Sequence, residues 1–336
     1  MCDKKLKMKQ ITNVLIKNLV DTIIHCQVKY FLTFIFLITN CNLLKAQDYT
    51  WWNNVHHWDG ITPWSRYIIM SPGYMGPNAL PVPEIETGEI DNRTKLEFGA
   101  ASHTITGDQT ENLFVNFSYT LAKDFAALKF MYIPVEHYQM DTLIRDQRFA
   151  RNYSGKGFAT GDFYFGTVIG LFKNSQTLPP VSIGMYCKTA LGKEIADARF
   201  TDSPGYYFTV ASNKTFTFEN SLLSKLQLNG MLGFYCWQFN YSDDNTGNLQ
   251  DDAILYGIAA DMTFGKYSLY AGFAGYSGWV NNRDKPMVIR TSFTCHQNNN
   301  DYKLGFQIGT FDVYYKTITL SVTHNWTRKF DEKKPE

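Results

Sequence analysis

The sequence predicts an all-β fold, a transmembrane antiparallel β-barrel of about twelve strands preceded by an irregular N-terminal segment. Three observations support this prediction. Between residues 94 and 326, segments of about ten residues alternate polar and apolar side chains, which is the period of a strand. The connections between these segments alternate between short and long. The 336 residues are 16% aromatic and 19% charged, without the repeated long apolar runs of a multi-helix membrane protein.

Alternation identifies each predicted strand. In residues 112–122, Leu113 and Phe117 fall on one face, and Asn112 and Asn116 fall on the other. Most segments exceed the five or six residues that are usual in soluble proteins and reach the length of a tilted membrane-crossing strand. The predicted strands lie near residues 95–104, 112–122, 125–139, 157–172, 180–192, 205–217, 223–240, 252–264, 267–279, 286–296, 302–310 and 313–326.

The connections carry an independent signal. Those that follow even-numbered segments are short, as at residues 123–124 and 265–266. Most of those that follow odd-numbered segments are longer, as at 140–156, 193–204 and 241–251. Short periplasmic turns and long extracellular loops are typical of outer-membrane barrels, and an even strand number places both barrel ends on the periplasmic side.

On these features the chain resembles the Gram-negative outer-membrane β-barrel class, over residues 94–330 and the leader, without matching one characterised family. The resemblance implies location in the outer membrane, with outer-membrane lipid and the barrel-insertion machinery as partners. Barrels of this class commonly end on an aromatic residue, which Trp326 and Phe330 match loosely. The polar tail at residues 331–336 departs from that pattern.

A soluble all-β sandwich or a lipocalin-like barrel is the alternative fold. Its strands would be shorter and its outward face polar. Strand length, the leader and the asymmetry of the connections favour the membrane barrel. A net charge of +1 argues against nucleic acid as a partner.

Residues 1–46 are predicted to be a signal peptide with an unusually long N-terminal extension. A lysine-rich flank precedes a short apolar run at residues 30–37, and the small residue Ala46 ends the segment. A lipoprotein leader acylated at Cys41 fits less well, because Asn40 is a poor junction residue. Three cysteines follow the leader, Cys187, Cys236 and Cys295, and an odd, widely spaced set forms no disulfide framework.

Residues 47–93 do not alternate and are rich in tryptophan and proline, with Trp51, Trp52, Trp58 and Trp64. The aromatic content favours an ordered segment over a disordered leader. We expect this segment to cover its apolar surface inside the barrel as a plug that narrows the channel from the periplasmic side. Cations of the lumen, such as Lys188 and Arg290, would hold its acidic residues. Those residues are Glu84, Glu86 and Glu89.

Alternation also predicts which polar side chains point into the lumen, because a charged residue facing lipid is costly. The predicted lumen-lining residues are Lys95, Glu97, Asp162, Tyr186, Lys188, Lys225, Asp261, Tyr270, Arg290 and Lys303. Charged residues also gather in two predicted extracellular loops, which we expect to be solvated or to form a polar vestibule. These loop candidates are Arg145, Asp146, Arg148, Arg199 and Asp202.

No metal site, cofactor or assembled catalytic centre is predicted. Adjacent His56 and His57 lack metal-ligand spacing. His103 and Asp162 are candidate parts of a hydrolase site, but their relation in space is unknown from the sequence. Passage or binding of a small polar solute is therefore the leading functional prediction, and an enzyme is less expected. The alternatives are a barrel enzyme acting on lipid or envelope material, and a structural or adhesion barrel.

Overall fold

The computed structural model describes residues 48–175, 178–239 and 249–327. The chain divides into two compact units, Met1–Trp51 and Trp52–Glu336, and the second unit is described below. The predicted signal peptide at residues 1–46, Phe330 and the tail at 331–336 lie outside the described residues. None of the helices in the described parts of the chain is long and apolar enough to cross a membrane.

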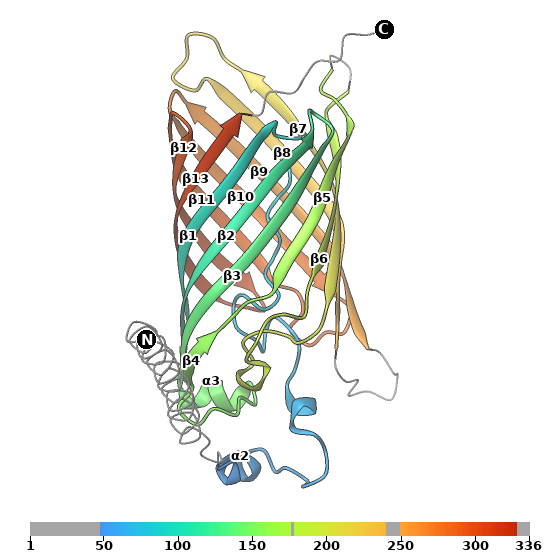
Figure 1. Ribbon diagram of the computed structural model, residues 1–336, viewed down its shortest axis with the longest axis vertical. Coiled ribbons are helices and arrows are strands. Elements are labelled where there is room, and N and C mark those ends of the chain that lie inside the picture. Colours follow the sequence, from blue (N-terminus) through green and yellow to red (C-terminus); the bar gives the residue numbers. More distant parts are fainter. Residues whose placement is uncertain (1–47, 176–177, 240–248, 328–336) are drawn as a thin grey trace, which may run out of the picture. The chain divides into compact units, whose positions relative to one another are not determined.

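Twelve long antiparallel strands form a closed barrel, which confirms the predicted fold class (Figure 1). Each strand pairs with its neighbours in the sequence, and β1 closes the barrel on β13, from Arg93 opposite Thr327 to Ile105 opposite Tyr315. The strands are β1 (Arg93–Ile105), β2 (Asp108–Ala122), β3 (Ala126–Met140), β5 (Phe163–Phe172), β6 (Val181–Lys188), β7 (Gly205–Thr217), β8 (Lys225–Gln238), β9 (Gln250–Phe264), β10 (Tyr267–Gly278), β11 (Met287–Gln297), β12 (Asn300–Phe311) and β13 (Tyr315–Thr327).

The single strand predicted at residues 157–172 is instead two strands. The short β4 (Lys156–Ala159) pairs only with β3, opposite Glu136–Gln139, and does not close the barrel. The chain then leaves the sheet at Gly161, whose amide donates to the carbonyl oxygen of Ile133, before β5 begins. Asp162 lies between the two strands and forms a buried ion pair. The polar and apolar residues therefore keep alternating although the strand is interrupted.

Two connections at one end of the barrel contain helical turns. Helix α3 (Thr142–Gln147) follows β3, and the carboxylate of Asp141 accepts a hydrogen bond from the amide of Ile144 at its N-terminus. The 3-10 helix η2 (Ile195–Asp197) lies in the connection 189–204. We call this end, which carries the connections 141–162, 189–204, 239–249 and 279–286, the long-loop end. The opposite end, with the connections 123–125, 173–180, 218–224, 265–266 and 298–299, is the short-turn end.

The two faces of the wall differ as the alternation predicts. On β2, Leu113 is exposed on the outer face, while Asn112 is buried inside. An outward row of stacked rings runs across three strands, from Phe117 through Phe130 to Phe163. The inward face carries the main core, in which Tyr235 contacts Trp237 and other buried aromatic side chains. The outer wall therefore presents apolar surface, and the polar and packed groups lie within.

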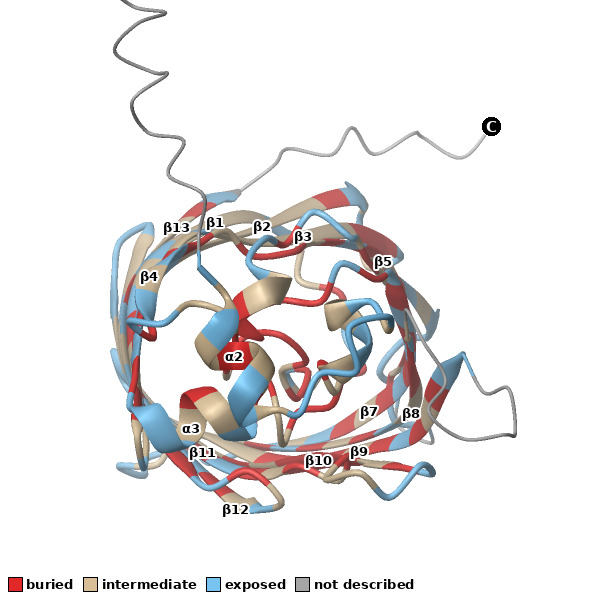
Figure 2. Ribbon diagram, turned by 90° about the horizontal axis from the view of Figure 1, so that it is seen from below, coloured by how far each residue is buried: buried red, intermediate tan, exposed pale blue. Residues whose placement is uncertain are grey.

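The N-terminal segment contains α2 (Thr50–Val55) and the 3-10 helix η1 (Trp64–Tyr67), and from Trp52 onward it lies at the long-loop end. The indole of Trp52 donates to the carbonyl oxygen of Phe149, just after α3. The guanidinium of Arg151 lies over the ring of Trp64. Figure 2, which views the barrel from this end, shows α2 and α3 across the mouth and the following chain inside the ring of strands.

Residues 68–92, which we call the strap, then run through the lumen to the short-turn end. The amide of Gly76 donates to Ala198 at the long-loop end, and Tyr276 donates to the carbonyl oxygen of Leu80 deeper inside. Gly88 passes so close to the wall that a Cβ atom there would come within 2.2 Å of the Pro180 carbonyl oxygen. The plug was expected to enter from the short-turn side, but Trp52 and Trp64 lie at the other end.

Candidate functional site

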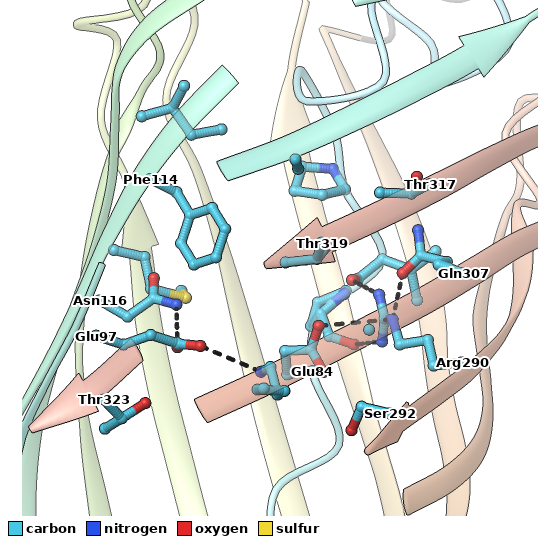
Figure 3. A pocket seen from close by; sticks show the side chains of 18 of the residues that line it. Glu84, Glu97, Phe114, Asn116, Arg290, Ser292, Gln307, Thr317, Thr319 and Thr323 are labelled. Carbon is cyan, nitrogen blue, oxygen red and sulfur yellow. Dashed lines mark hydrogen bonds and ion pairs between the residues drawn. The ribbon is translucent and has the colours of Figure 1, made fainter. Parts of the chain in front are cut away.

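A cavity of about 700 Å³ occupies the lumen beside the strap (Figure 3). Most of its wall comes from β1–β3 and β10–β13, with single residues from β5, β6, β7 and β9, and strap residues 77–86 form its other side. The lining extends from Arg93 and Asp301 at the short-turn end to His103 near the long-loop end. Eight of the ten predicted lumen residues line it: Lys95, Glu97, Asp162, Tyr186, Asp261, Tyr270, Arg290 and Lys303.

Arg290 anchors the strap to the wall of this cavity. Its two terminal nitrogens donate to the carbonyl oxygens of Val82 and Pro83, at 2.5 and 2.8 Å. Its Nε atom lies 3.5 Å from the carboxylate of Glu84, as the sequence led us to expect for this pair. The Glu84 side chain is nevertheless 75% exposed, although it lies within the barrel. The cavity is therefore open to water around this carboxylate.

A second polar group lies nearer the short-turn end. The carboxylate of Glu97 lies 3.2 Å from Lys303 Nζ and accepts hydrogen bonds from Ser321 and Asn116. Lys95 pairs with Asp91 of the strap at 2.5 Å. Each cation of this group thus has an acidic partner. The hydroxyl of Ser321 and the amide of Asn116 supply the remaining hydrogen bonds of the Glu97 carboxylate.

Lys188 does not hold the strap, contrary to our expectation. Its Nζ atom lies 2.6 Å from Asp162, with both side chains buried, and donates to the Thr201 hydroxyl and the Ser203 carbonyl oxygen. This ammonium group is therefore fully occupied by Asp162 and by the connection 189–204. The strap residue Glu86 is bonded instead by the hydroxyl of Tyr186.

The remaining predicted lumen residues have fewer partners. The carboxylate of Asp261 accepts a hydrogen bond from Asn229 at 2.8 Å. Tyr270 contributes to the cavity lining, and its hydroxyl is buried without a hydrogen-bond partner among the described residues. Lys225 lies at the start of β8, on the same face as Gln227 and Asn229, and does not line the cavity.

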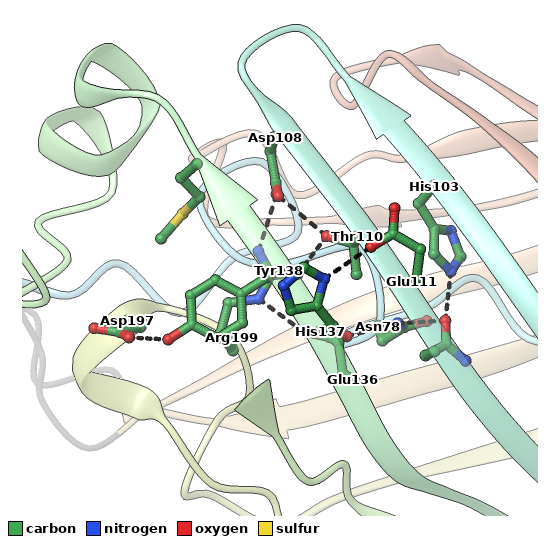
Figure 4. Close-up of polar contacts among 12 residues, drawn as sticks. Asn78, His103, Asp108, Thr110, Glu111, Glu136, His137, Tyr138, Asp197 and Arg199 are labelled. Atoms are coloured by element: carbon green, nitrogen blue, oxygen red, sulfur yellow. Dashed lines mark hydrogen bonds and ion pairs between the residues drawn. The ribbon is translucent and has the colours of Figure 1, made fainter. Parts of the chain in front are cut away.

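Arg199 closes the long-loop end with a buried ionic cluster, which we call the latch (Figure 4). Its guanidinium lies 2.8 Å from Glu136 and 3.0 Å from Asp108, and all three side chains are fully buried. Arg148 also pairs with Asp108, at 2.6 Å. The strap joins the latch through Asn78, whose amide donates to Glu136 at 2.7 Å. Two loops, the wall and the strap are therefore tied together.

The electrostatics of Arg199 follow from this burial. Burial disfavours its charge, but the carboxylates of Glu136 and Asp108 outweigh that cost and hold the pKa of Arg199 above its ordinary value. The expectation of solvated loop side chains is therefore wrong for Arg148 and Arg199. Arg145 is also buried, where it bonds Asp146 and the Tyr153 carbonyl oxygen. Asp202 alone of the five loop candidates is exposed.

The two parts of a hydrolase site that the sequence suggested, His103 and Asp162, have separate partners, and Asp162 pairs with Lys188. His103 lies buried between Thr317 and Asn112, at 2.8 Å from each. Asn112 is an amide, and it also accepts a hydrogen bond from Asn78. This histidine is therefore part of the hydrogen-bond network that continues into the latch.

A serine, a histidine and an aspartate that sequence reasoning missed meet at the short-turn end. The Oγ atom of Ser268 lies 2.7 Å from His296 Nε2, and His296 Nδ1 lies 2.6 Å from Asp301 Oδ1. Asn325 donates to the other carboxylate oxygen of Asp301, at 2.9 Å. All three members line the cavity. Their strands, β10, β11 and β12, are consecutive in the barrel wall.

A signal for this group was present in the sequence. His296 and Asp301 flank the turn 298–299, so the hairpin places them opposite one another. Both share the inward alternation of Arg290 and Lys303, and Ser268 shares that of Tyr270. The register between β10 and β11, which sets Ser268 beside Thr294, was the missing information.

No protein-family model and no curated protein matches this chain. Among solved structures, an outer membrane channel from Pseudomonas putida F1 has a TM-score of 0.47 at 9% identity, covering 74% of this chain and 97% of that one. LpxR from Salmonella typhimurium has a TM-score of 0.44 at 10% identity, covering 68% and 99%. The translocator domain of the autotransporter NalP from Neisseria meningitidis has a TM-score of 0.37 at 8% identity, covering 70% and 87%.

Proposed function

We propose that this protein is an outer-membrane β-barrel of a Gram-negative cell whose lumen binds a small polar solute and passes it when the strap moves. The observation that carries this proposal is the polar-lined cavity of about 700 Å³, which lies within the size range of ligand sites. The strap forms one wall of this cavity, so a movement of the strap changes both the site and the path.

The cavity lining favours a neutral or zwitterionic solute over an ion of one sign. Both basic and acidic side chains line it, together with residues that carry hydroxyl groups. The basic residues are Arg93, Lys95, Lys129, Arg290 and Lys303, and the acidic residues are Glu84, Glu86, Glu97, Asp162, Asp261 and Asp301. Asp162 is neutralised by Lys188, so the two signs are closely balanced.

Membrane insertion is supported by the apolar outer wall and by the two kinds of connection. Barrels of the outer membrane carry short turns on the periplasmic side and long loops outside. We therefore assign the short-turn end to the periplasm and the long-loop end to the cell surface. Outer-membrane lipid and the barrel-insertion machinery are the partners that this assignment requires.

Conductance in planar bilayers tests the role of the strap. We expect deletion of residues 48–89 to raise the conductance of the purified protein, because the strap fills the lumen beside the cavity. A matched control lacks residues 48–61 only and keeps the strap, so its conductance stays low. Equal conductance of the full-length and strap-deleted proteins, with both barrels folded, would contradict the proposal.

Cysteine labelling tests the orientation. Ile61 at the long-loop end and Leu222 at the short-turn end are 87% and 85% exposed, which makes them a matched pair. In a chain without other cysteines, Ile61→Cys should react with an impermeant maleimide on intact cells. Leu222→Cys should react only after the outer membrane is permeabilised. The reverse pattern would invert the assignment of the two ends.

A further inference from the structure

We propose that Ser268, His296 and Asp301 form a hydrolytic site for short-chain esters at the short-turn mouth of the lumen. The hydrogen bonds define the role of each group. Asp301 is an acceptor, so His296 Nδ1 carries a proton and donates it. His296 Nε2 then holds a lone pair that accepts the hydroxyl proton of Ser268, at 2.7 Å.

Two other histidines, His103 and His137, each lack either the hydroxyl partner or the carboxylate partner. His103 contacts Thr317 and the amide of Asn112, and no carboxylate orients it. His137 lies 3.0 Å from Glu111, and no hydroxyl group in the described part of the chain bonds it. His296 is the one histidine among the described residues that bridges a serine hydroxyl and a carboxylate.

The site is accessible as well as organised. The His296 side chain is 41% exposed, and the Ser268 side chain borders the cavity. Asn325 fixes the second oxygen of Asp301, so Asp301 acts as a positioning residue for the imidazole. Thr294 faces Ser268 across the β10–β11 pairing and also lines the cavity. We assign its hydroxyl as a donor to the oxyanion that forms on the substrate.

Ester hydrolysis on these residues proceeds in two steps, acylation of Ser268 and hydrolysis of the acyl-enzyme. Ser268 Oγ attacks the ester carbonyl carbon while its proton passes to His296 Nε2, and collapse of the tetrahedral intermediate breaks the bond to the alcohol oxygen. The alcohol leaves with the proton from His296, and an acyl-Ser268 remains. Water then attacks the acyl carbon and gives a proton to His296. Ser268 recovers that proton as the carboxylic acid leaves, so one ester and one water yield one acid and one alcohol.

The cavity sets the class of substrate. Its charged and hydroxyl lining suits a short acyl group on a small polar alcohol rather than a long acyl chain. This choice of substrate rests on the solute-binding cavity proposed above, whereas the chemistry of the three residues does not. A barrel without conductance would still hydrolyse an ester at this mouth.

An alkyl fluorophosphonate and p-nitrophenyl acetate are the probes, used with the full-length protein in detergent. We expect the fluorophosphonate to label the wild-type protein and the Ser277→Ala control but not Ser268→Ala. Ser277 is a matched control because it lies on the same strand as Ser268, β10, and does not line the cavity. Heat-modifiable electrophoretic migration verifies that each variant has a closed barrel.

Ester turnover gives the second readout. His296→Gln should lower it by about 100-fold or more, because the general base is lost. Asp301→Asn should lower the rate and alter its pH dependence, and Asp301→Glu should restore part of both.

Two outcomes would overturn the proposal. One is labelling or turnover that persists in folded Ser268→Ala. The other is the absence of both labelling and turnover in the folded wild-type protein. Conductance measured on the same samples separates this result from the proposed solute passage, because Ser268→Ala leaves the strap and Arg290 intact.

Discussion

The two ends of the lumen use the same kinds of charged side chain in opposite ways. At the long-loop end, Arg199, Glu136 and Asp108 form the latch with no exposed side-chain surface. At the short-turn end, Arg93 and Asp91 form a pair whose side chains are 46% and 36% exposed. The first arrangement excludes water and fixes the strap. The second leaves a hydrated mouth, where the cavity and the Ser268 group are reached.

Burial explains why the ion pairs at the two ends differ in strength. Removing one member of a buried pair leaves its partner charged and unpaired in a medium of low dielectric constant. Breaking the latch therefore requires a large free energy. An exposed pair is screened by water, and its rupture costs little. Movement of the strap should therefore begin at the short-turn end and be limited by the latch.

The largest effect is expected from breaking the latch. Arg199→Met should destabilise the barrel by about 3–5 kcal/mol, because Glu136 loses its buried cationic partner. The double variant Arg199→Met with Glu136→Gln should regain part of that loss by removing the stranded charge. Urea unfolding of the protein in lipid vesicles measures both changes.

The matched control for the latch is Arg93→Ala at the other end, which should cost no more than about 1 kcal/mol. Conductance sharpens the comparison further. If the latch limits strap movement, Arg199→Met should raise the frequency of open events, and Arg93→Ala should not. Equal destabilisation by the two variants would show that the two ends do not differ in the way described.

A smaller effect tests whether a bilayer separates the two ends. Phe117→Arg places a charge on the outer face of β2 and should destabilise the barrel by about 2–4 kcal/mol or block insertion. Asn116→Arg, one residue away, points into the lumen beside Glu97 and should be tolerated. Folding yield and urea stability in vesicles compare the two. Similar tolerance at both positions would contradict a lipid-facing outer wall.

The smallest effect concerns pH at the short-turn end. Burial raises the pKa of Asp91, but the hydrogen bonds and charges of Arg93 and Lys95 outweigh it and hold this pKa well below its ordinary value. The resulting stability is present above about pH 4, the ordinary value for aspartate, and is lost as the pH falls toward the lowered pKa. Because this pair is part-exposed, the loss should be at most about 1 kcal/mol.

Asp91→Asn should remove that pH dependence and leave the latch unchanged. Urea stability measured at neutral pH and in acid, for the wild-type protein and for this variant, gives the comparison. A pH dependence that survives in Asp91→Asn would assign it to other carboxylates of the barrel.

The inward and outward faces of the barrel wall were predictable because polar and apolar residues alternate along each strand. Leu113 and Asn112 alternate in the sequence, and the structure places Leu113 outside and Asn112 inside. The same rule separated Phe163 from Tyr164, on either side of one backbone. Adjacent strands also follow one another in the chain, so the order of pairing needed no information beyond the sequence.

The partners of the charged residues were less predictable. Arg290 and Glu84 meet as expected, but Lys188 pairs with Asp162 from a neighbouring connection. Alternation gives the face of a side chain and not its height along the barrel axis. That height depends on the register between strands, which the turns and irregularities of several hairpins set together.

The sequence by itself determined the strands, their inward and outward faces and the two kinds of connection, because these features follow from the local period of the backbone. The tertiary structure alone decided the course of the strap, the burial of Arg199 in the latch and the meeting of Ser268 with His296. Each of these joins segments distant in the chain or brings strands into register. Such contacts exist only once the barrel has closed, because closure fixes which side chains share the lumen and at what height.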